Sequence, residues 1–133
     1  MLARSRRRVL SALALTFALM TGAGATPASA AVYDFCAVPA CADARGAFEY
    51  WEGEGLPARR VTNHLPGDRC FTGGGTFGNR EEQLPEEEHG AYREFDVYAR
   101  PCGQGRDAHR IVVHHETGET WYTGDHYRNF YRL

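Results

Sequence analysis

From residue 76 onward the sequence alternates between apolar and polar side chains with the two-residue period of a β-strand. Four strands are predicted in this way, at residues 91–99, 108–115, 119–123 and 129–132. The first three are separated by short turns, at residues 101–105 and 116–118. Strands joined by short turns pair antiparallel, so this half of the chain predicts a β-meander.

The apolar face of such a sheet needs a cover, and residues 39–51 supply the candidate helix. Apolar residues recur there at helical spacing: Ala40, Ala44, Ala47, Phe48 and Trp51. Pro39 suits a first helical turn, and Gly53 suits the end of a helix. Residues 52–75 are rich in Gly, Pro and Arg without a sustained period, which predicts mostly loop. We therefore expect an α+β fold, with an N-terminal helix packed on a twisted antiparallel β-sheet.

Residues 1–30 have the pattern of a secretory signal peptide. Four arginines precede an apolar stretch at residues 9–25, and Ala28-Ser29-Ala30 has the small side chains of a signal peptidase site. We expect cleavage after Ala30, which leaves residues 31–133 as a single domain. A retained membrane anchor is the alternative interpretation, and the softening of the apolar stretch before the cleavage pattern argues against it.

The charge of the remaining chain restricts its partners. Residues 31–133 contain 11 arginines, no lysine and 17 acidic residues, which gives a formal charge of −6. Bulk charge does not attract nucleic acid to such a protein. Any polyanionic partner must therefore be bound by a local cluster of arginines.

Export to an oxidising compartment predicts two disulfides among the four cysteines, which are Cys36, Cys41, Cys70 and Cys102. Three connectivities are open. We favour Cys36–Cys41 with Cys70–Cys102, because the first pair is too close in sequence to suit much else. A zinc site is the weaker alternative, since the sequence has no Cys-x-x-Cys pair.

One face of the predicted sheet carries charged side chains. Glu94 lies in mid-strand, Arg110 lies on the same side of the next strand, and Arg106 precedes Arg110 by four residues. Taken alone, a surface ion-pair network is the simpler interpretation. A functional interpretation needs an acid–base partner and a bound anion. His126, in the turn after the third strand, is the candidate partner.

In order along the chain, these parts resemble a known family. The matching segments are Phe77-Gly78-Asn79-Arg80-Glu81, Leu84-Pro85, Tyr92-Arg93-Glu94, Arg106, Arg110-Ile111, Tyr122-Thr123-Gly124-Asp125-His126-Tyr127 and Phe130. They are similar to segments of the secreted bacterial guanyl-specific ribonucleases, the family of barnase and the streptomycete extracellular ribonucleases. Each segment alone is a weak signal, but the ordered set is specific.

The resemblance implies a metal-independent endoribonuclease that needs no cofactor. Glu94 would be the general base and His126 the general acid, while Arg106 and Arg110 would hold the charge of the phosphorane. The implied products are a 2′,3′-cyclic phosphate and then 3′-guanylate. The alternative is a non-catalytic secreted binding module, stapled by disulfides, on the same scaffold.

By the same resemblance, residues 77–81 would select guanine. Glu81 would accept the N1–H and N2–H₂ donors of the base, while the backbone of Asn79 and Arg80 would donate to O6. Phe77 and Tyr127 would offer flat faces for stacking, as is typical of single-stranded RNA recognition.

The expected partner is single-stranded RNA, and no membrane association is expected after the signal is cleaved. The family also implies a barstar-like intracellular protein inhibitor. We expect a secreted, extracellular monomer.

Overall fold

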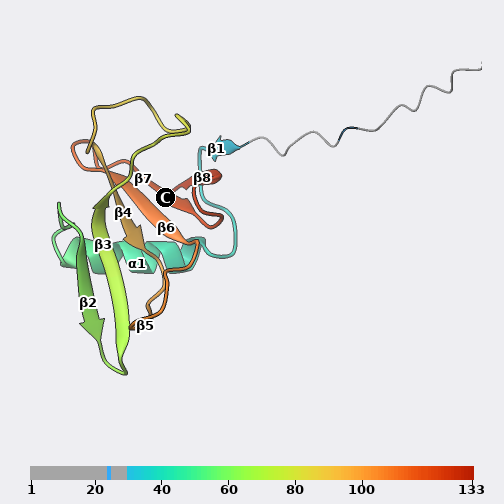
Figure 1. Cartoon of the computed structure of the whole chain (residues 1–133). Helices are drawn as coiled ribbons and strands as arrows, with labels where there is room; N and C mark the ends of the chain where they lie inside the picture. Colours follow the sequence, from blue (N-terminus) through green and yellow to red (C-terminus); the bar gives the residue numbers. More distant parts are fainter. Residues whose placement is uncertain (1–23, 25–29) are drawn as a thin grey trace, which may run out of the picture.

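The computed structural model describes residue 24 and residues 30–133 (Figure 1). The expected signal peptide therefore lies almost entirely outside the described residues. Within the described part, no helix is long and apolar enough to cross a membrane.

Residues 30–133 form one helix, α1 (Cys41–Gly53), and a mixed, largely antiparallel sheet. Its strands are β1 (Ala31–Tyr33), β2 (Val61–Leu65), β3 (Arg69–Thr76), β4 (Tyr92–Asp96), β5 (Arg100–Pro101), β6 (Arg110–His114), β7 (Thr120–Thr123) and β8 (Asn129–Arg132). They are ordered β1-β8-β7-β6-β4-β3-β2, and the short β5 pairs with β3. The α+β fold expected from the sequence is confirmed.

The predicted meander is present as β4, β6, β7 and β8, which pair antiparallel in chain order. The bounds of β8 coincide with the predicted strand, while the other three strands are shorter than predicted. At the edge of the sheet, β1 pairs with β8 in parallel, with Ala31 opposite Asn129. Alternation in the sequence carried no signal for this three-residue strand.

The prediction that residues 52–75 are mostly loop is wrong. They contain β2 and most of β3, which form a hairpin with Val61 opposite Gly73. Gly73 explains why the pattern was missed. A Cβ atom there would lie 2.5 Å from Phe95 Cδ1 and 2.9 Å from Trp51 Cη2. Neighbouring aromatic rings fill the space of the absent side chain, so the glycine stretch of the strand is buried without apolar side chains of its own.

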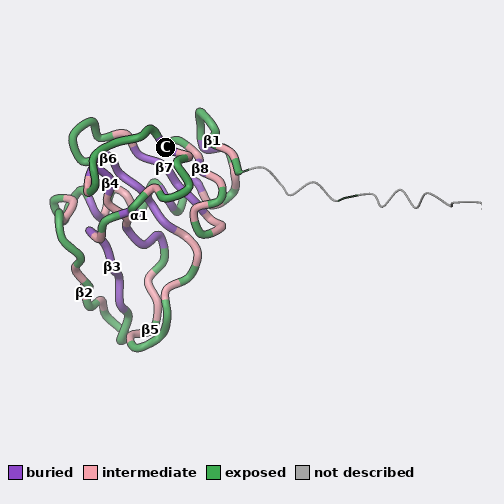
Figure 2. The backbone as a smooth tube through the Cα atoms, turned by 45° about the horizontal axis from the view of Figure 1, so that its top comes forward, coloured by how far each residue is buried: buried purple, intermediate pink, exposed green. Residues whose placement is uncertain are grey.

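Helix α1 covers one face of the sheet, two residues further along the chain than predicted (Figure 1). Ala44, Ala47 and Trp51 are buried and pack with Phe95 and Ile111 of the sheet. A second apolar cluster lies on the opposite face and contains Phe77, Leu84, Tyr92, Val112, Trp121 and Phe130. In Figure 2 the buried stretches follow β3, β4, β6 and β7 through the middle of the molecule.

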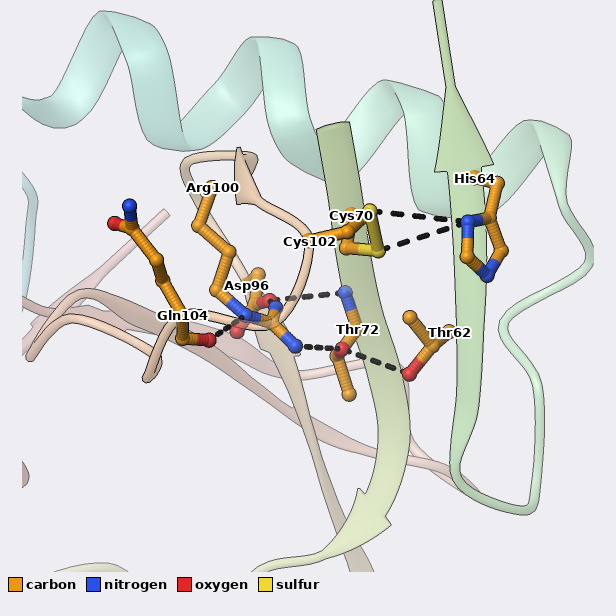
Figure 3. Close-up of a disulfide and its surroundings, with 8 residues drawn as sticks. All are labelled: Thr62, His64, Cys70, Thr72, Asp96, Arg100, Cys102 and Gln104. Atoms are coloured by element: carbon orange, nitrogen blue, oxygen red, sulfur yellow. Dashed lines mark hydrogen bonds and ion pairs between the residues drawn. A yellow bond between two sulfur atoms is a disulfide. The ribbon is translucent and has the colours of Figure 1, made fainter. Parts of the chain in front are cut away.

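Two disulfides join the four cysteines, with the connectivity that the spacing favours. Cys36 is bonded to Cys41 at the start of α1, and Cys70 of β3 is bonded to Cys102. The second disulfide fixes the β5–β6 loop, which carries Arg106, to the β2–β3 hairpin (Figure 3). It therefore attaches the loop to the sheet close to the charged face.

Candidate active site

The charged face is built by the register of β4 and β6. Glu94 lies opposite Val112, and Asp96 lies opposite Arg110. Side chains of directly opposed residues share one face of a sheet, so Glu94, Asp96 and Arg110 point to the same side, as the alternation predicts. Arg106 reaches this face from the β5–β6 loop: its Nη1 is 2.7 Å from Glu94 Oε1, and its Nε is 2.7 Å from Asp96 Oδ1.

Asp96 is the organising carboxylate of this face, and the sequence did not single it out. It is 2% exposed and accepts hydrogen bonds from Thr72 N at 2.9 Å and Arg100 Nη1 at 3.0 Å (Figure 3). It also accepts from Arg106 Nε. Arg110 Nη1 lies 3.6 Å away. A buried carboxylate that accepts hydrogen bonds from several cationic partners fixes their orientation. Alternation placed Asp96 beside Glu94, but gave no sign of these donors.

Two guanidinium nitrogens on this face are left without a partner. Arg106 Nη2 and Arg110 Nε are buried and make no hydrogen bond to any residue that the structure describes. Arg110 is 3% exposed, and its Nη1 donates to the carbonyl of His109 at 2.6 Å. Buried donors cost free energy unless they are paired, so the arrangement favours a bound anion that accepts from both arginines.

Tyr127 connects Glu94 to His126. Its hydroxyl donates a hydrogen bond to Glu94 Oε2, and its ring centroid lies 5.1 Å from that of His126. Burial, followed by the hydrogen bond to Glu94, raises the pKa of Tyr127 far above that of a free tyrosine. The phenol is therefore protonated at neutral pH. Glu94 is held between this hydroxyl and Arg106.

His126 is exposed, and an unusual turn presents it. Its φ is +60° and that of Tyr127 is +71°. Asp125 supports the turn: its Oδ1 accepts from the backbone N–H groups of Arg128 and Asn129. Burial opposes ionisation of Asp125, but these bonds and those from the side chains of Asn129 and Thr123 outweigh it and lower its pKa. Left-handed backbone at two consecutive non-glycine residues is typical of functional sites.

The predicted guanine-binding segment forms one wall of a cavity of about 670 Å³. The cavity is lined by Thr76, Phe77, Gly78, Asn79, Arg80, Glu81, His89, Glu94 and Tyr127. Asn79 fixes the loop, since its side chain accepts from Leu84 N at 3.1 Å and donates to Leu84 O at 2.8 Å. Arg80 and Glu81 are exposed.

The structure brings the predicted residues together in two adjoining groups. Glu94 and Tyr127 belong to the cavity wall. They also join the cavity to the second group, because Glu94 is hydrogen-bonded to Arg106 and the ring of Tyr127 lies next to that of His126. Phe77 differs from the prediction of an open stacking face. It is 8% exposed and packs against Tyr127 with ring centroids 4.8 Å apart.

One cluster in the described residues has ligand types suited to a metal, namely His64 with Cys70 and Cys102. The two sulfur atoms are bonded to each other, and His64 Nδ1 lies 3.7 Å from each (Figure 3). A thiolate is the form of cysteine that binds a metal, so the oxidised pair offers no ligand.

Comparison with known protein families shows to which family the chain belongs. A family model described as ribonuclease matches residues 30–133, which include every residue of the candidate site. The chain belongs to this ribonuclease family.

Two curated ribonucleases are similar over shorter segments. Guanyl-specific ribonuclease Sa of Kitasatospora aureofaciens is 42% identical over 57 residues, which cover 43% of this chain and 58% of that protein. Guanyl-specific ribonuclease St of Saccharopolyspora erythraea is 46% identical over 57 residues, which cover 43% of this chain and 54% of that protein. The chain thus matches little more than half the length of these relatives.

Proposed function

We propose that this ribonuclease is a secreted endoribonuclease that cleaves single-stranded RNA after guanosine without a metal ion. One observation carries the proposal: Glu94, at the wall of the cavity, is paired with Arg106 beside two buried guanidinium N–H groups that lack a partner among the described residues. The names of the two similar ribonucleases support the choice of guanine.

In the proposed first step, Glu94 accepts the proton of the ribose 2′-hydroxyl as O2′ attacks the phosphorus. The bond from phosphorus to O5′ of the next nucleotide breaks, and His126 gives its proton to that oxygen. The products are a 2′,3′-cyclic phosphate and a free 5′-hydroxyl. Hydrolysis of the cyclic phosphate then uses the same two groups in reversed roles and yields 3′-guanylate.

Arg106 and Arg110 would hold the phosphorane that forms between the base and the acid. Their unpartnered nitrogens, Arg106 Nη2 and Arg110 Nε, are fixed by the ion pairs of the same guanidiniums before substrate binds. Donors that are oriented in advance stabilise developing charge without reorganisation. A guanidinium also stays charged throughout the working pH range.

Guanine would occupy the cavity beside Glu94. Glu81 would accept from N1–H and N2–H₂, and the backbone of Asn79 and Arg80 would donate to O6. Asn79 has a φ of +46°, and its side chain is bonded to Leu84, which supports a loop whose backbone is fixed before the base binds. Because Phe77 is buried under Tyr127, the tyrosine ring is the better stacking surface.

We propose further that the enzyme acts outside the cell as a monomer, after cleavage of a signal peptide at Ala30. Two disulfides among residues 36–102 support an oxidising compartment. A barstar-like inhibitor in the producing cell would bind the same charged face.

Cleavage of the four dinucleotides GpN, ApN, CpN and UpN in EDTA tests the proposal. We expect cleavage of GpN with 3′-guanylate as the final product, and a bell-shaped dependence of kcat/KM on pH. Glu94→Gln and His126→Ala should each lower kcat/KM by roughly 10²–10⁴-fold while the thermal unfolding transition persists.

Activity that requires Mg²⁺, or that survives both substitutions, would refute the proposed mechanism. Binding of 3′-guanylate without turnover of any dinucleotide would instead indicate the non-catalytic module. His64→Ala is a control for His126→Ala, because both histidines are exposed and His64, in β2, lines neither the cavity nor the charged face.

A further inference from the structure

A second groove adjoins the candidate guanine cavity. It has a volume of about 570 Å³ and lies between residues 87–93 and residues 114–116. His89 lines both the groove and the cavity. Arg93 in the groove also donates from Nη1 to Thr76 Oγ1 at 2.5 Å, and Thr76 lines the cavity. A ligand could therefore extend from one hollow into the other.

Two buried donors in this groove have no partner among residues 24 and 30–133. They are His114 Nε2 and Arg93 Nε. His114 is only 3% exposed, yet its nearest carboxylate oxygen, Glu87 Oε1 at 3.4 Å, does not complete a hydrogen bond. Leaving such donors unpaired is unfavourable, so an acceptor from a ligand would be stabilised here.

The tautomer of His114 argues against a metal ligand. Its Nδ1 accepts a hydrogen bond from the backbone N–H of Thr117 at 3.2 Å. In a neutral imidazole the proton then resides on Nε2, the nitrogen that faces Glu87. A nitrogen that carries a proton cannot coordinate a cation, but it can donate to an uncharged acceptor.

The charge of the groove argues against a phosphate as the main occupant. Its lining includes three carboxylates, those of Glu87, Glu88 and Glu116, and one guanidinium, that of Arg93. An anion would be repelled on balance. Donors alternating with acceptors suit the edge of a nucleobase, which is neutral and has both kinds of group.

The position of the groove along β6 indicates which nucleotide of the RNA it would bind. Arg110 is the first residue of β6 and His114 is the last, so the arginines and the groove lie at opposite ends of this strand. The proposed scissile phosphate, on the 3′ side of guanosine, lies at the Arg110 end. We propose that the groove binds the base of the nucleotide on the 5′ side of the guanosine; this inference rests on the proposed ribonuclease function.

Three substrates separate the contributions of base and phosphate: GpC, pGpC and ApGpC. We expect kcat/KM for ApGpC to exceed that for GpC by roughly tenfold, the equivalent of one net hydrogen bond. The rate for pGpC should stay close to that for GpC. If ApGpC is cleaved no faster than pGpC, the inference is overturned.

Arg93→Gln tests the groove itself. We expect this variant to abolish most of the advantage of ApGpC over GpC, and Arg93→Lys to retain part of it, because lysine keeps the charge but loses the Nε donor. Arg45→Gln is the matched control: Arg45 is an exposed arginine of α1, away from both hollows, and should leave the ratio unchanged. An equal loss in Arg45→Gln would contradict the inference.

A binding measurement decides the question without turnover or substitution. The imidazole N–H signal of His114 should shift in ¹H–¹⁵N spectra on addition of 2′-deoxy ApGp, but not of 2′-deoxyguanosine 3′-phosphate. Equal shifts with both ligands would overturn the inference. If none of the three substrates is cleaved, the proposed function fails separately, and this titration still tests the groove.

Discussion

Asp96 fixes three arginines around the proposed phosphate site, because it is the buried acceptor that they share. Arg106 and Arg100 donate to it directly, and Arg110 Nη1 lies 3.6 Å from it. Its position explains how two guanidinium nitrogens can stay buried and unpaired among the described residues, since the rest of each guanidinium is held by an ion pair.

Asp96→Asn should therefore be strongly destabilising. The substitution removes the carboxylate that Arg100, Arg106 and Arg110 share and takes from Arg100 its acidic partner among the described residues, which costs about 3–5 kcal/mol. Urea unfolding at pH 7 measures the loss, with Asp68→Asn as a control, because Asp68 is exposed and its left-handed φ of +56° is one that asparagine tolerates. A loss below about 1 kcal/mol would show that Asp96 contributes little to the network.

Tyr127→Phe removes the hydroxyl that donates to Glu94 but keeps the ring that packs on Phe77. A hydrogen bond to a charged group contributes about 1.5–3 kcal/mol, so we expect kcat/KM for GpN to fall by roughly 10–100-fold when this bond no longer orients Glu94. Tyr98→Phe is the control, since Tyr98 bonds Asp43 and is partly exposed. Equal effects of the two substitutions would argue against a role for the Tyr127 hydroxyl.

The sheet face of an individual residue could be predicted where apolar and polar side chains alternate along a strand. Alternation put Glu94 and Arg110 on one face, and the register of β4 and β6 agrees. The same alternation gave no reason to choose Asp96 over any other strand carboxylate, because its donors come from positions 72, 100 and 106, in three different segments. Contacts of that kind arise from the tertiary structure.

At the scale of elements, the Cys70–Cys102 disulfide should stabilise the fold more than Cys36–Cys41. The two bonds close sequence separations of 32 and 5 residues. Loop-closure entropy then predicts losses of about 4 and about 2 kcal/mol when each pair is replaced by alanine. Urea unfolding of the two double variants measures both values. A larger loss for the shorter loop would contradict the entropic account.

The turn that carries His126 should weaken in acid, because the folded protein lowers the pKa of Asp125. A lowered pKa stabilises the fold above the unfolded-state pKa, near 4, and this contribution disappears as the pH falls through the folded-state value. Asp125→Asn should therefore lower the free energy of unfolding by about 1–2 kcal/mol at pH 7, because an amide donor replaces Oδ2, which accepts from the Asn129 side chain. The loss should be smaller at pH 3.

The free energies of unfolding of the wild type and Asp125→Asn at the two pH values test this expectation. Asp34→Asn is an exposed control and should show no such pH dependence. A difference that is constant between pH 3 and pH 7 would contradict the role of the ionised carboxylate.

Elements were predictable where their own residues carried the pattern. The helix and the four strands of the meander were found because their side chains alternate or recur in sequence. The β2–β3 hairpin was missed because Gly73, Gly74 and Gly75 have no side chains, and aromatic rings from α1 and β4 fill the space at Gly73. The parallel pairing of β1 depends on a partner 98 residues away, at Asn129.

For the whole molecule, net negative charge opposes the local attraction of RNA to the arginines. Residues 31–133 have a formal charge of −6. Two phosphate contacts would give a slope of about −1.4 for log kcat/KM against log salt on single-stranded RNA, and screening of the overall repulsion should make it shallower. Cleavage of a GpN-containing oligonucleotide at 50–500 mM NaCl measures the slope. A value steeper than about −2 would indicate further cationic contacts.

The pairing of β1 with β8 also places a contact of very long sequence separation at the border of the sheet. Ala31, Val32 and Tyr33 lie opposite Asn129, Phe130 and Tyr131, so β1 can pair only after β8 is in place. The central strands can pair with one another before that, while this border stays open. Closure of the border is therefore a late step of folding.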